Sequence, residues 1–200
     1  MTIRTETIAA AVAKANQTIK RHEQELNAAD AKLGDGDTGG MLARVLGKMA
    51  EADLSEADPG TALTRLAKAA TVATGSSLGT LFATGLLAVG RQAKGRETIE
   101  VADLAAFVAS ARDAMMERGG ASLGDKTVLD SLDAIATALQ GKTSPTEAAD
   151  AAAQAAADAL NTFRSRPNRI GRARMFGDQT IGIDDPGMLA VMHLAGAIAE

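Results

Sequence analysis

Residues 8–30 read IAAAVAKANQTIKRHEQELNAAD, and their apolar side chains recur at steps of four and three. The repeating positions are Ile8, Val12, Ala15, Ile19, His22 and Leu26. This spacing places them on one face of a long amphipathic helix, which we expect to end near Asp30. The next ten residues, AKLGDGDTGG, are rich in Gly and Asp and interrupt the pattern. The segment therefore predicts a helix followed by a polar loop.

The same spacing recurs along the rest of the chain. It predicts further helices over residues 41–49, 59–73, 81–89, 101–119, 128–139, 145–159 and 186–198. Alanine, the strongest helix former, supplies 44 of the 200 residues, whereas the aromatic residues are four Phe with no Tyr or Trp. We expect an all-α fold, a single domain over residues 1–200 with about eight amphipathic helices.

The composition excludes several classes of protein. The chain has no cysteine, which excludes a disulfide framework, a thiolate zinc site and a cysteine nucleophile. Its formal net charge is −4, so it lacks the basic excess that nucleic-acid-binding proteins direct at phosphates. No segment has the ~20 consecutive apolar residues that cross a bilayer, and the N-terminal residues lack a signal-peptide pattern. We expect a cytoplasmic protein with no nucleic-acid partner and no membrane span.

The loop at residues 30–40 is the densest polar signal. Asp30, Asp35 and Asp37 would repel one another there unless a cation neutralised them, and carboxylate oxygens suit Mg²⁺ or Ca²⁺. The loop does not match an EF-hand, and the GxGxxG spacing from Gly34 lacks the preceding strand of a dinucleotide-binding motif. A tight Asp-Gly turn without a metal ion stays open as the alternative interpretation.

Two further segments place suitable ligand-binding groups where a helix is expected to begin. GSSLGT, residues 75–80, offers hydroxyl groups and unpaired backbone N–H groups, to which the positive end of a helix dipole attracts an anion such as phosphate. The same residues are ordinary helix caps. DDPG, residues 184–187, is likewise typical of a cap with proline in the first turn. Anion binding and capping both stay open for residues 75–80, whereas residues 184–187 are expected to form a cap.

The histidines and a group of arginines receive only structural expectations. His22 lies on the apolar face of the first helix, so we expect a packed or interface residue. His193 falls off the apolar stripe of the last helix, so we expect it to be exposed. Residues 165–185 are loop-like and basic, and a solvated loop is the expected structure, with phosphate contacts as the alternative.

Five motifs occur in an order typical of one family. They are Asp30 with GDGDTG (residues 34–39), GSSLG (75–79), GDKTVLD (124–130), GRA (171–173), and IG (181–182) with DPG (185–187). Each motif alone is a weak signal, but the five together are specific and cover almost the whole chain. The sequence resembles the nucleotide-binding L subunit of dihydroxyacetone kinases, a DAK2-type domain.

The resemblance implies a fold and a set of site residues. The family fold is a barrel of eight antiparallel helices that binds ATP, or tightly bound ADP, at one end through Mg²⁺. Asp30, Asp35 and Asp37 are implied as the metal ligands and catalytic residues. The residues implied to border the nucleotide are Thr38, Gly39, Gly40, Met41, Ser76, Ser77, Gly119, Val128, Asp185, Pro186 and Gly187. The implied chemistry is phosphoryl transfer by charge neutralisation and positioning.

The resemblance also implies partners. A separate K-type subunit would hold dihydroxyacetone, or a related short ketose such as erythrulose, so this chain alone is expected to phosphorylate no sugar. Family members that use a phosphocarrier protein commonly have His, Asn and Arg where this chain has Thr38, Met41 and Gln179. The phosphoryl donor, ATP or a phosphocarrier, therefore stays open, as does a homodimer. A non-catalytic nucleotide-sensing or lipid-binding regulatory protein on the same barrel is the alternative function.

Overall fold

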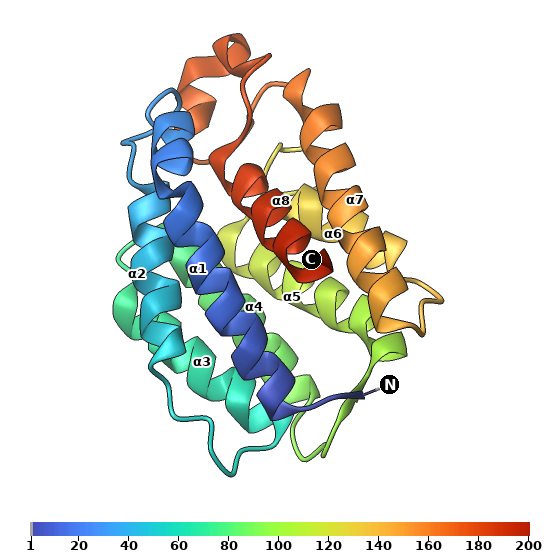
Figure 1. The fold of residues 1–200 in the computed structure, drawn as a ribbon. Helices are drawn as coiled ribbons and strands as arrows, with labels where there is room; N and C mark the ends of the chain where they lie inside the picture. The colour runs from blue at the N-terminus through green and yellow to red at the C-terminus, as the bar shows by residue number, and fades with distance from the viewer. Residues whose placement is uncertain (1) are drawn as a thin grey trace.

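The computed structural model describes residues 2–200, and eight α-helices dominate the described chain. They are α1 (Thr5–Asp30), α2 (Thr38–Ala50), α3 (Pro59–Ala73), α4 (Ser77–Gln92), α5 (Leu104–Gly119), α6 (Val128–Ala138), α7 (Pro145–Arg164) and α8 (Pro186–Ala199). Each helix packs on the next in sequence, and α8 packs on α1 (Figure 1). The helices therefore form a closed ring, and the expected all-α barrel is confirmed.

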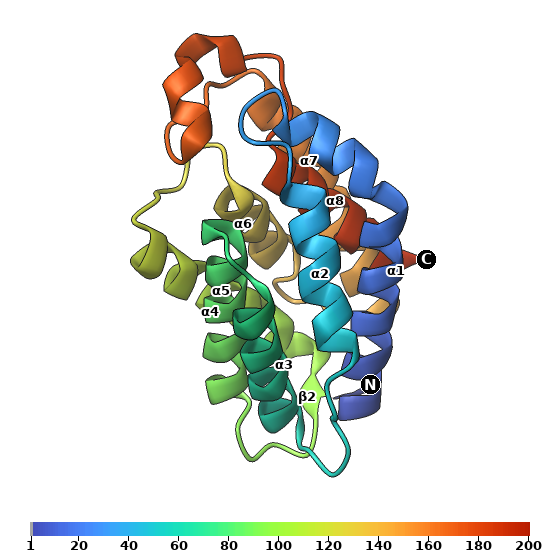
Figure 2. The same ribbon diagram turned by 90° about the vertical axis from the view of Figure 1, so that its left-hand side faces the viewer.

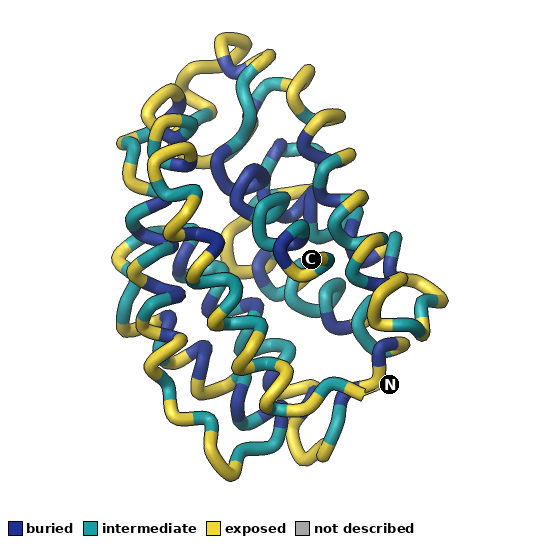
Figure 3. The backbone as a smooth tube through the Cα atoms, viewed as in Figure 1, coloured by how far each residue is buried: buried dark blue, intermediate teal, exposed yellow. Residues whose placement is uncertain are grey.

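The core lies inside this ring and is built from the predicted apolar faces (Figure 3). Ile19 and Leu26 of α1 are fully buried, and Ile8, Val12 and Ala15 pack partly buried against the same cluster. Several alanine side chains on other helices of the ring have no exposed surface either, and their small size permits close helix packing. Among the described residues, no helix combines the length and apolar character needed to cross a membrane.

Two segments differ from the expected pattern of helices and loops. Thr2–Ile3 (β1) pairs antiparallel with Ile99–Glu100 (β2), and a 3-10 turn, η1 (Val101–Asp103), precedes α5 (Figure 2). Residues 165–185 include a 3-10 helical segment, η2 (Arg172–Thr180), kinked at Gly177. We call residues 165–185 the capping segment, because they cross one end of the barrel (Figure 2). The long-range contacts described below hold it in a defined position.

The alternating direction of the helices distinguishes the two ends of the barrel. The N-termini of α2, α4, α6 and α8 lie at the end with the capping segment, which we call the open end (Figure 1). The N-termini of the other four helices lie at the opposite, closed end, where β1 and β2 pair. The loops singled out in the sequence therefore meet at the open end.

Candidate nucleotide site

An open cavity of about 1240 Å³ lies at the open end of the barrel. Its wall combines the loop after α1, the starts of α2, α4, α6 and α8, the end of α5 and part of the capping segment. Every predicted site residue lines this cavity except Gly39 and Gly40. A smaller hollow of about 550 Å³ lies between α6 and α7 and contains none of the predicted residues.

Gly39 and Gly40 lie behind the cavity wall and position it. Their backbone N–H groups donate to Oδ1 of Asn27, at 2.8 and 3.1 Å respectively. A Cβ atom on Gly39 would lie 2.2 Å from the carbonyl oxygen of Glu23 in α1. Only glycine therefore permits α2 to begin directly against α1, which places the acidic loop at the cavity.

The three predicted metal ligands come together at one edge of the cavity. Asp30, Asp35 and Asp37 each offer a carboxylate oxygen, and these atoms lie within 4.8 Å of one another. Oδ2 of the buried Asp30 also accepts hydrogen bonds from the backbone N–H groups of Asp37 (2.9 Å) and Thr38 (3.2 Å). Gly36 has a φ of 76°, which permits the tight turn between them. An all-oxygen set of this kind fits Mg²⁺ or Ca²⁺.

Arg172 of the capping segment faces this acidic group and forms an ion pair with Asp35. The Arg172 guanidinium holds the pKa of Asp35 below its ordinary value, chiefly through a side-chain hydrogen bond. Both side chains are at least half exposed, so the pair contributes little to folding stability. The arginine-rich loop expected to be solvated thus supplies a cation beside the three carboxylates.

The other helix starts at the cavity are capped by their own side chains. Oγ of Ser76 accepts from the backbone N–H of Gly79 (3.1 Å), and Oδ1 of Asp185 accepts from that of Met188 (3.0 Å). Thr127 caps α6 in a capping box. Ser76 and Asp185 therefore act as helix caps. The helices that they cap also begin at the cavity, where the helix dipoles favour negative charge.

A buried polar network behind the wall was not predicted from the sequence. Nζ of Lys126, a residue only 1% exposed, donates to the carbonyl oxygens of Arg166 (2.9 Å) and Thr180 (2.8 Å). Nδ2 of Asn168 donates to the carbonyl oxygen of Lys126 and to Oδ2 of Asp185, each at 2.9 Å. Burial lowers the pKa of Lys126 and raises that of Asp185 to about 6. The network fastens the capping segment to α6 and α8.

The rest of the cavity wall includes both apolar and basic side chains. The apolar lining comes from α4, α6 and the capping segment: Leu78, Leu81, Val128, Leu129, Ile170 and Met175. The basic lining includes Arg44 and Arg118, which sequence analysis did not identify, because neither belongs to a motif. A ligand with an apolar part and an anionic part would match this lining.

Comparison with known proteins identifies the family. The family model described as the DAK2 domain matches residues 32–200. The chain belongs to the DAK2 domain family.

Relatives of this DAK2 domain include kinases and kinase subunits. It is 34% identical to a D-erythrulose kinase of Mycolicibacterium smegmatis, over 89% of this chain and 32% of the relative. It is 27% identical to the ADP-binding subunit DhaL of a PTS-dependent dihydroxyacetone kinase of Lactococcus lactis, over 94% of this chain and 92% of that protein. The DAK2 domain thus spans about a third of the erythrulose kinase but nearly all of the separate subunit.

A solved structure shares the fold. Dihydroxyacetone kinase of C. freundii, determined in complex with AMP-PNP and Mg²⁺, superposes with a TM-score of 0.76 at 26% sequence identity. The match covers 97% of this DAK2 domain and 33% of the longer protein.

Thr38, Met41 and Gln179, the three positions where phosphocarrier-dependent members are expected to carry other residues, lie in different surroundings in this DAK2 domain. Thr38 begins α2 and lines the cavity, as does Met41, although Met41 is only 2% exposed. Gln179 lies in η2, is exposed and does not line the cavity. Of the three positions, therefore, only Thr38 and Met41 line the cavity.

Proposed function

We propose that this DAK2 domain is the nucleotide-binding, phosphoryl-transferring subunit of a kinase for dihydroxyacetone or a related short ketose such as erythrulose. The observation that carries the proposal is the meeting of three carboxylates with four helix N-termini at one cavity. Carboxylates alone would repel a polyphosphate, whereas carboxylates that hold a cation beside helix N-termini attract it. The names of the relatives support the same substrate class.

Asp30, Asp35 and Asp37 are the proposed ligands of Mg²⁺ and the proposed catalytic residues. Asp30 is preorganised by its two backbone hydrogen bonds, and Asp37 is the N-cap residue of α2 but makes no capping hydrogen bond with its side chain. Bound Mg²⁺ would neutralise charge on the transferring phosphoryl group. The carboxylates fix its position against the cavity, and Arg172 can exchange Asp35 for a phosphate oxygen, because the ion pair is exposed.

The nucleotide phosphates are proposed to lie against the first turns of α4 and α8, at Ser76, Ser77 and residues 185–187. The base is proposed to lie on the apolar wall near Gly119 and Val128. Leu81 approaches Gly119 so closely that a Cβ there would lie 3.0 Å from Leu81 Cδ2. Thr38 and Met41 complete the border, and Gly39 and Gly40 act by positioning α2.

The ketose is proposed to be held by a separate K-type subunit. The cavity wall already accounts for the proposed nucleotide and metal ligands, and a relative of nearly this length is named as an ADP-binding subunit. The longer relatives, of which this domain is about a third, are named as kinases for the ketose itself. We expect no ketose phosphorylation by the purified chain alone.

Binding of MgADP and MgATP, measured by calorimetry, tests the nucleotide site. The Asp35→Ala/Asp37→Ala variant should lose at least ~100-fold in affinity, because a metal-bridged phosphate contact is removed. The matched control Glu97→Ala/Asp150→Ala removes two exposed carboxylates elsewhere and should bind normally. Unchanged binding by the first variant, with its helical circular dichroism intact, would refute the proposed site.

Reconstitution with K-type subunits then tests the activity. Ketose phosphorylation that requires both proteins supports the proposal, whereas Mg-nucleotide binding without turnover with any K subunit supports a nucleotide sensor. The ultraviolet spectrum of the freshly purified chain identifies the donor, because without Tyr or Trp an adenine band is easily seen. A retained band supports bound ADP that a phosphocarrier rephosphorylates, and a clear spectrum supports exchange of ATP.

A further inference from the structure

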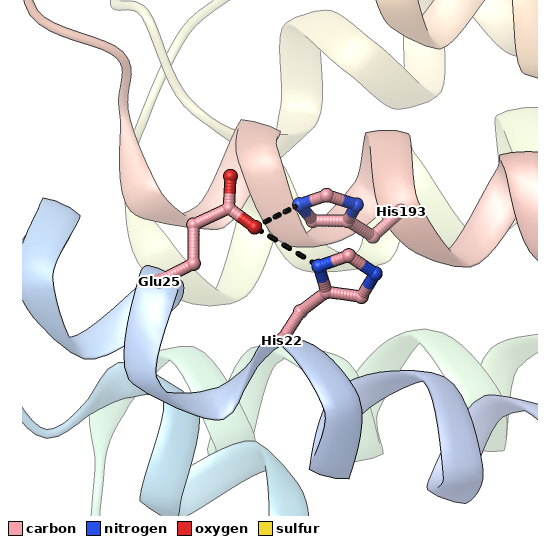
Figure 4. A group of neighbouring side chains, drawn as sticks. All are labelled: His22, Glu25 and His193. Atoms are coloured by element: carbon pink, nitrogen blue, oxygen red, sulfur yellow. Dashed lines mark hydrogen bonds and ion pairs between the residues drawn. The ribbon is translucent and has the colours of Figure 1, made fainter.

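A second group of metal-ligating side chains lies outside the cavity, where α1 packs on α8 (Figure 4). His22 and Glu25 come from consecutive turns of α1, and His193 comes from α8. One ligand atom from each side chain lies within 4.8 Å of the others. The three side chains therefore bring two imidazoles and one carboxylate to a single point between two helices.

The two imidazoles point the same way. Their rings stack with centroids 3.7 Å apart and an interplanar angle of 19°. Nδ1 of His22 lies 2.9 Å, and Nε2 of His193 lies 3.1 Å, from the same carboxylate oxygen, Oε2 of Glu25 (Figure 4). Two imidazole nitrogens this close to one point can supply two of the four ligands of a tetrahedral metal site once the stacked rings turn toward the metal.

His193 is not exposed, in contrast to the sequence expectation. Its side chain is 13% exposed, because the side of α8 that carries it faces the polar pair His22 and Glu25 rather than solvent. Among the described residues, its Nε2 is a buried atom without a partner in hydrogen-bonding geometry, since the contact with Glu25 is close but poorly directed.

We propose that His22, Glu25 and His193 bind a transition-metal ion, Zn²⁺ above all, between α1 and α8. Imidazole nitrogen suits Zn²⁺, Ni²⁺ and Cu²⁺, whereas Mg²⁺ prefers an all-oxygen site such as the acidic group at the cavity. Glu25 is half exposed, so its carboxylate can rotate outward, yield the shared point to the metal and remain as the third ligand. Water takes the fourth position.

The composition of the chain makes this site unusually easy to test. The chain contains two histidines and no cysteine, so all of its nitrogen and sulfur side-chain ligands for zinc are in this one group. The alternative zinc site is the carboxylate group of Asp30, Asp35 and Asp37, which excess Mg²⁺ should occupy. Zinc bound in the presence of Mg²⁺ can therefore be attributed to the histidines.

The decisive experiment is a titration of ¹⁵N-histidine-labelled protein with Zn²⁺ in excess Mg²⁺, followed by NMR. One equivalent of Zn²⁺ should shift the ligating nitrogen of both histidines together, and Mg²⁺ alone should shift neither. The wild-type chain suffices, so the outcome does not depend on whether a variant folds. Histidine signals that remain unchanged at saturating Zn²⁺ would overturn the proposal and leave an ordinary hydrogen-bonded group.

Variants then assign the ligands. His22→Gln, His193→Gln and Glu25→Gln should each weaken Zn²⁺ binding at least ~10-fold, whereas Glu6→Gln, on the same helix, should not. Asp35→Ala/Asp37→Ala should retain the histidine response to Zn²⁺, so this site succeeds or fails independently of the nucleotide proposal. Full zinc affinity in His22→Gln/His193→Gln would also overturn the assignment.

Discussion

The two ends of the barrel use similar helix starts, but different groups cover them. At the closed end, α3 begins with Asp58, whose carboxylate accepts from the backbone N–H groups of Gly60 (2.9 Å) and Thr61 (3.1 Å). Protein covers that turn directly, since a Cβ on Gly60 would lie 2.5 Å from the backbone nitrogen of Lys94. At the open end, α4 begins with the equivalent cap Ser76, but its first turn faces the cavity.

A capping residue is therefore purely structural where protein covers the first turn of its helix, and is available to a ligand where that turn faces a cavity. At the closed end, a substitution that disturbs a helix start should lower the free energy of unfolding and leave ligand binding unchanged. At the open end, such a substitution should lower both the free energy of unfolding and the affinity for the ligand. Four measurements test this contrast.

The largest effect is expected at the two glycines that permit close packing. Gly39→Ala would place a Cβ 2.2 Å from the carbonyl oxygen of Glu23, and Gly60→Ala would create a similar clash with the backbone near Lys94. Each should lower the free energy of unfolding by about 3 kcal/mol, because backbone must move. Gly39→Ala should also abolish MgADP binding, and Gly60→Ala should not.

Denaturant unfolding and calorimetry measure both quantities. Gly196→Ala is the control, because its Cβ meets nothing within 4 Å in α8, and it should stabilise the protein by up to about 1 kcal/mol. Loss of nucleotide binding in Gly60→Ala, at a temperature where the variant is folded, would contradict the separation of the two ends.

The next effect is the pH dependence contributed by Asp185 at the open end. Burial raises its pKa to about 6, so the folded chain retains a proton where the unfolded chain, with an ordinary pKa of 3.8, has lost it. This contribution to stability therefore falls as pH rises from about 4 to 6, by about 2–3 kcal/mol. The difference in unfolding free energy between wild type and Asp185→Asn should show that slope. A slope of the opposite sign would show that the carboxylate is the stabilised form.

Lys126→Met should have a smaller effect, centred on the capping segment. The substitution leaves the carbonyl oxygens of Arg166 and the buried Thr180 without this donor, which should cost about 2 kcal/mol. Limited proteolysis should cut residues 165–185 faster than in the exposed control Lys68→Met. Equal cleavage rates would mean that other contacts hold the segment in place.

The smallest effect compares the two caps directly. Ser76→Ala and Asp58→Ala should each lower the free energy of unfolding by about 1 kcal/mol, the usual value for an N-cap. Only Ser76→Ala should also weaken MgADP binding. The contrast between the ends would fail if both variants, or neither, changed the nucleotide affinity.

Much of the fold could be predicted because helix periodicity is a local property. The spacing of Ile8, Val12 and Ile19 marks a face that packs against the core, and the helices predicted from residues 59 and 145 do begin at Pro59 and Pro145. The pairing of β1 with β2 could not be predicted, because two residues carry no periodicity. The expectation that His193 is exposed was wrong, because its burial depends on the polar side chains of α1 that lie opposite it.

The site was predictable only where its residues occur as short motifs. The acidic loop, GSSLG and DPG all reach the cavity, as their order in the sequence suggested. Arg44 and Arg118 have no motif, and the bonds of Lys126 join residues 40 and 54 positions apart. Contacts of that range depend on how the ring closes, which no local pattern encodes.

Ring closure has a consequence for local unfolding. Because α8 packs on α1, every helix has a neighbour on both sides, and none can detach without opening two interfaces. The helical amides should therefore exchange with solvent as one cooperative unit, whereas residues 165–185, held chiefly by Lys126 and Asn168, should exchange faster. The barrel would then remain a rigid frame while the segment over the cavity opens to admit and release ligand.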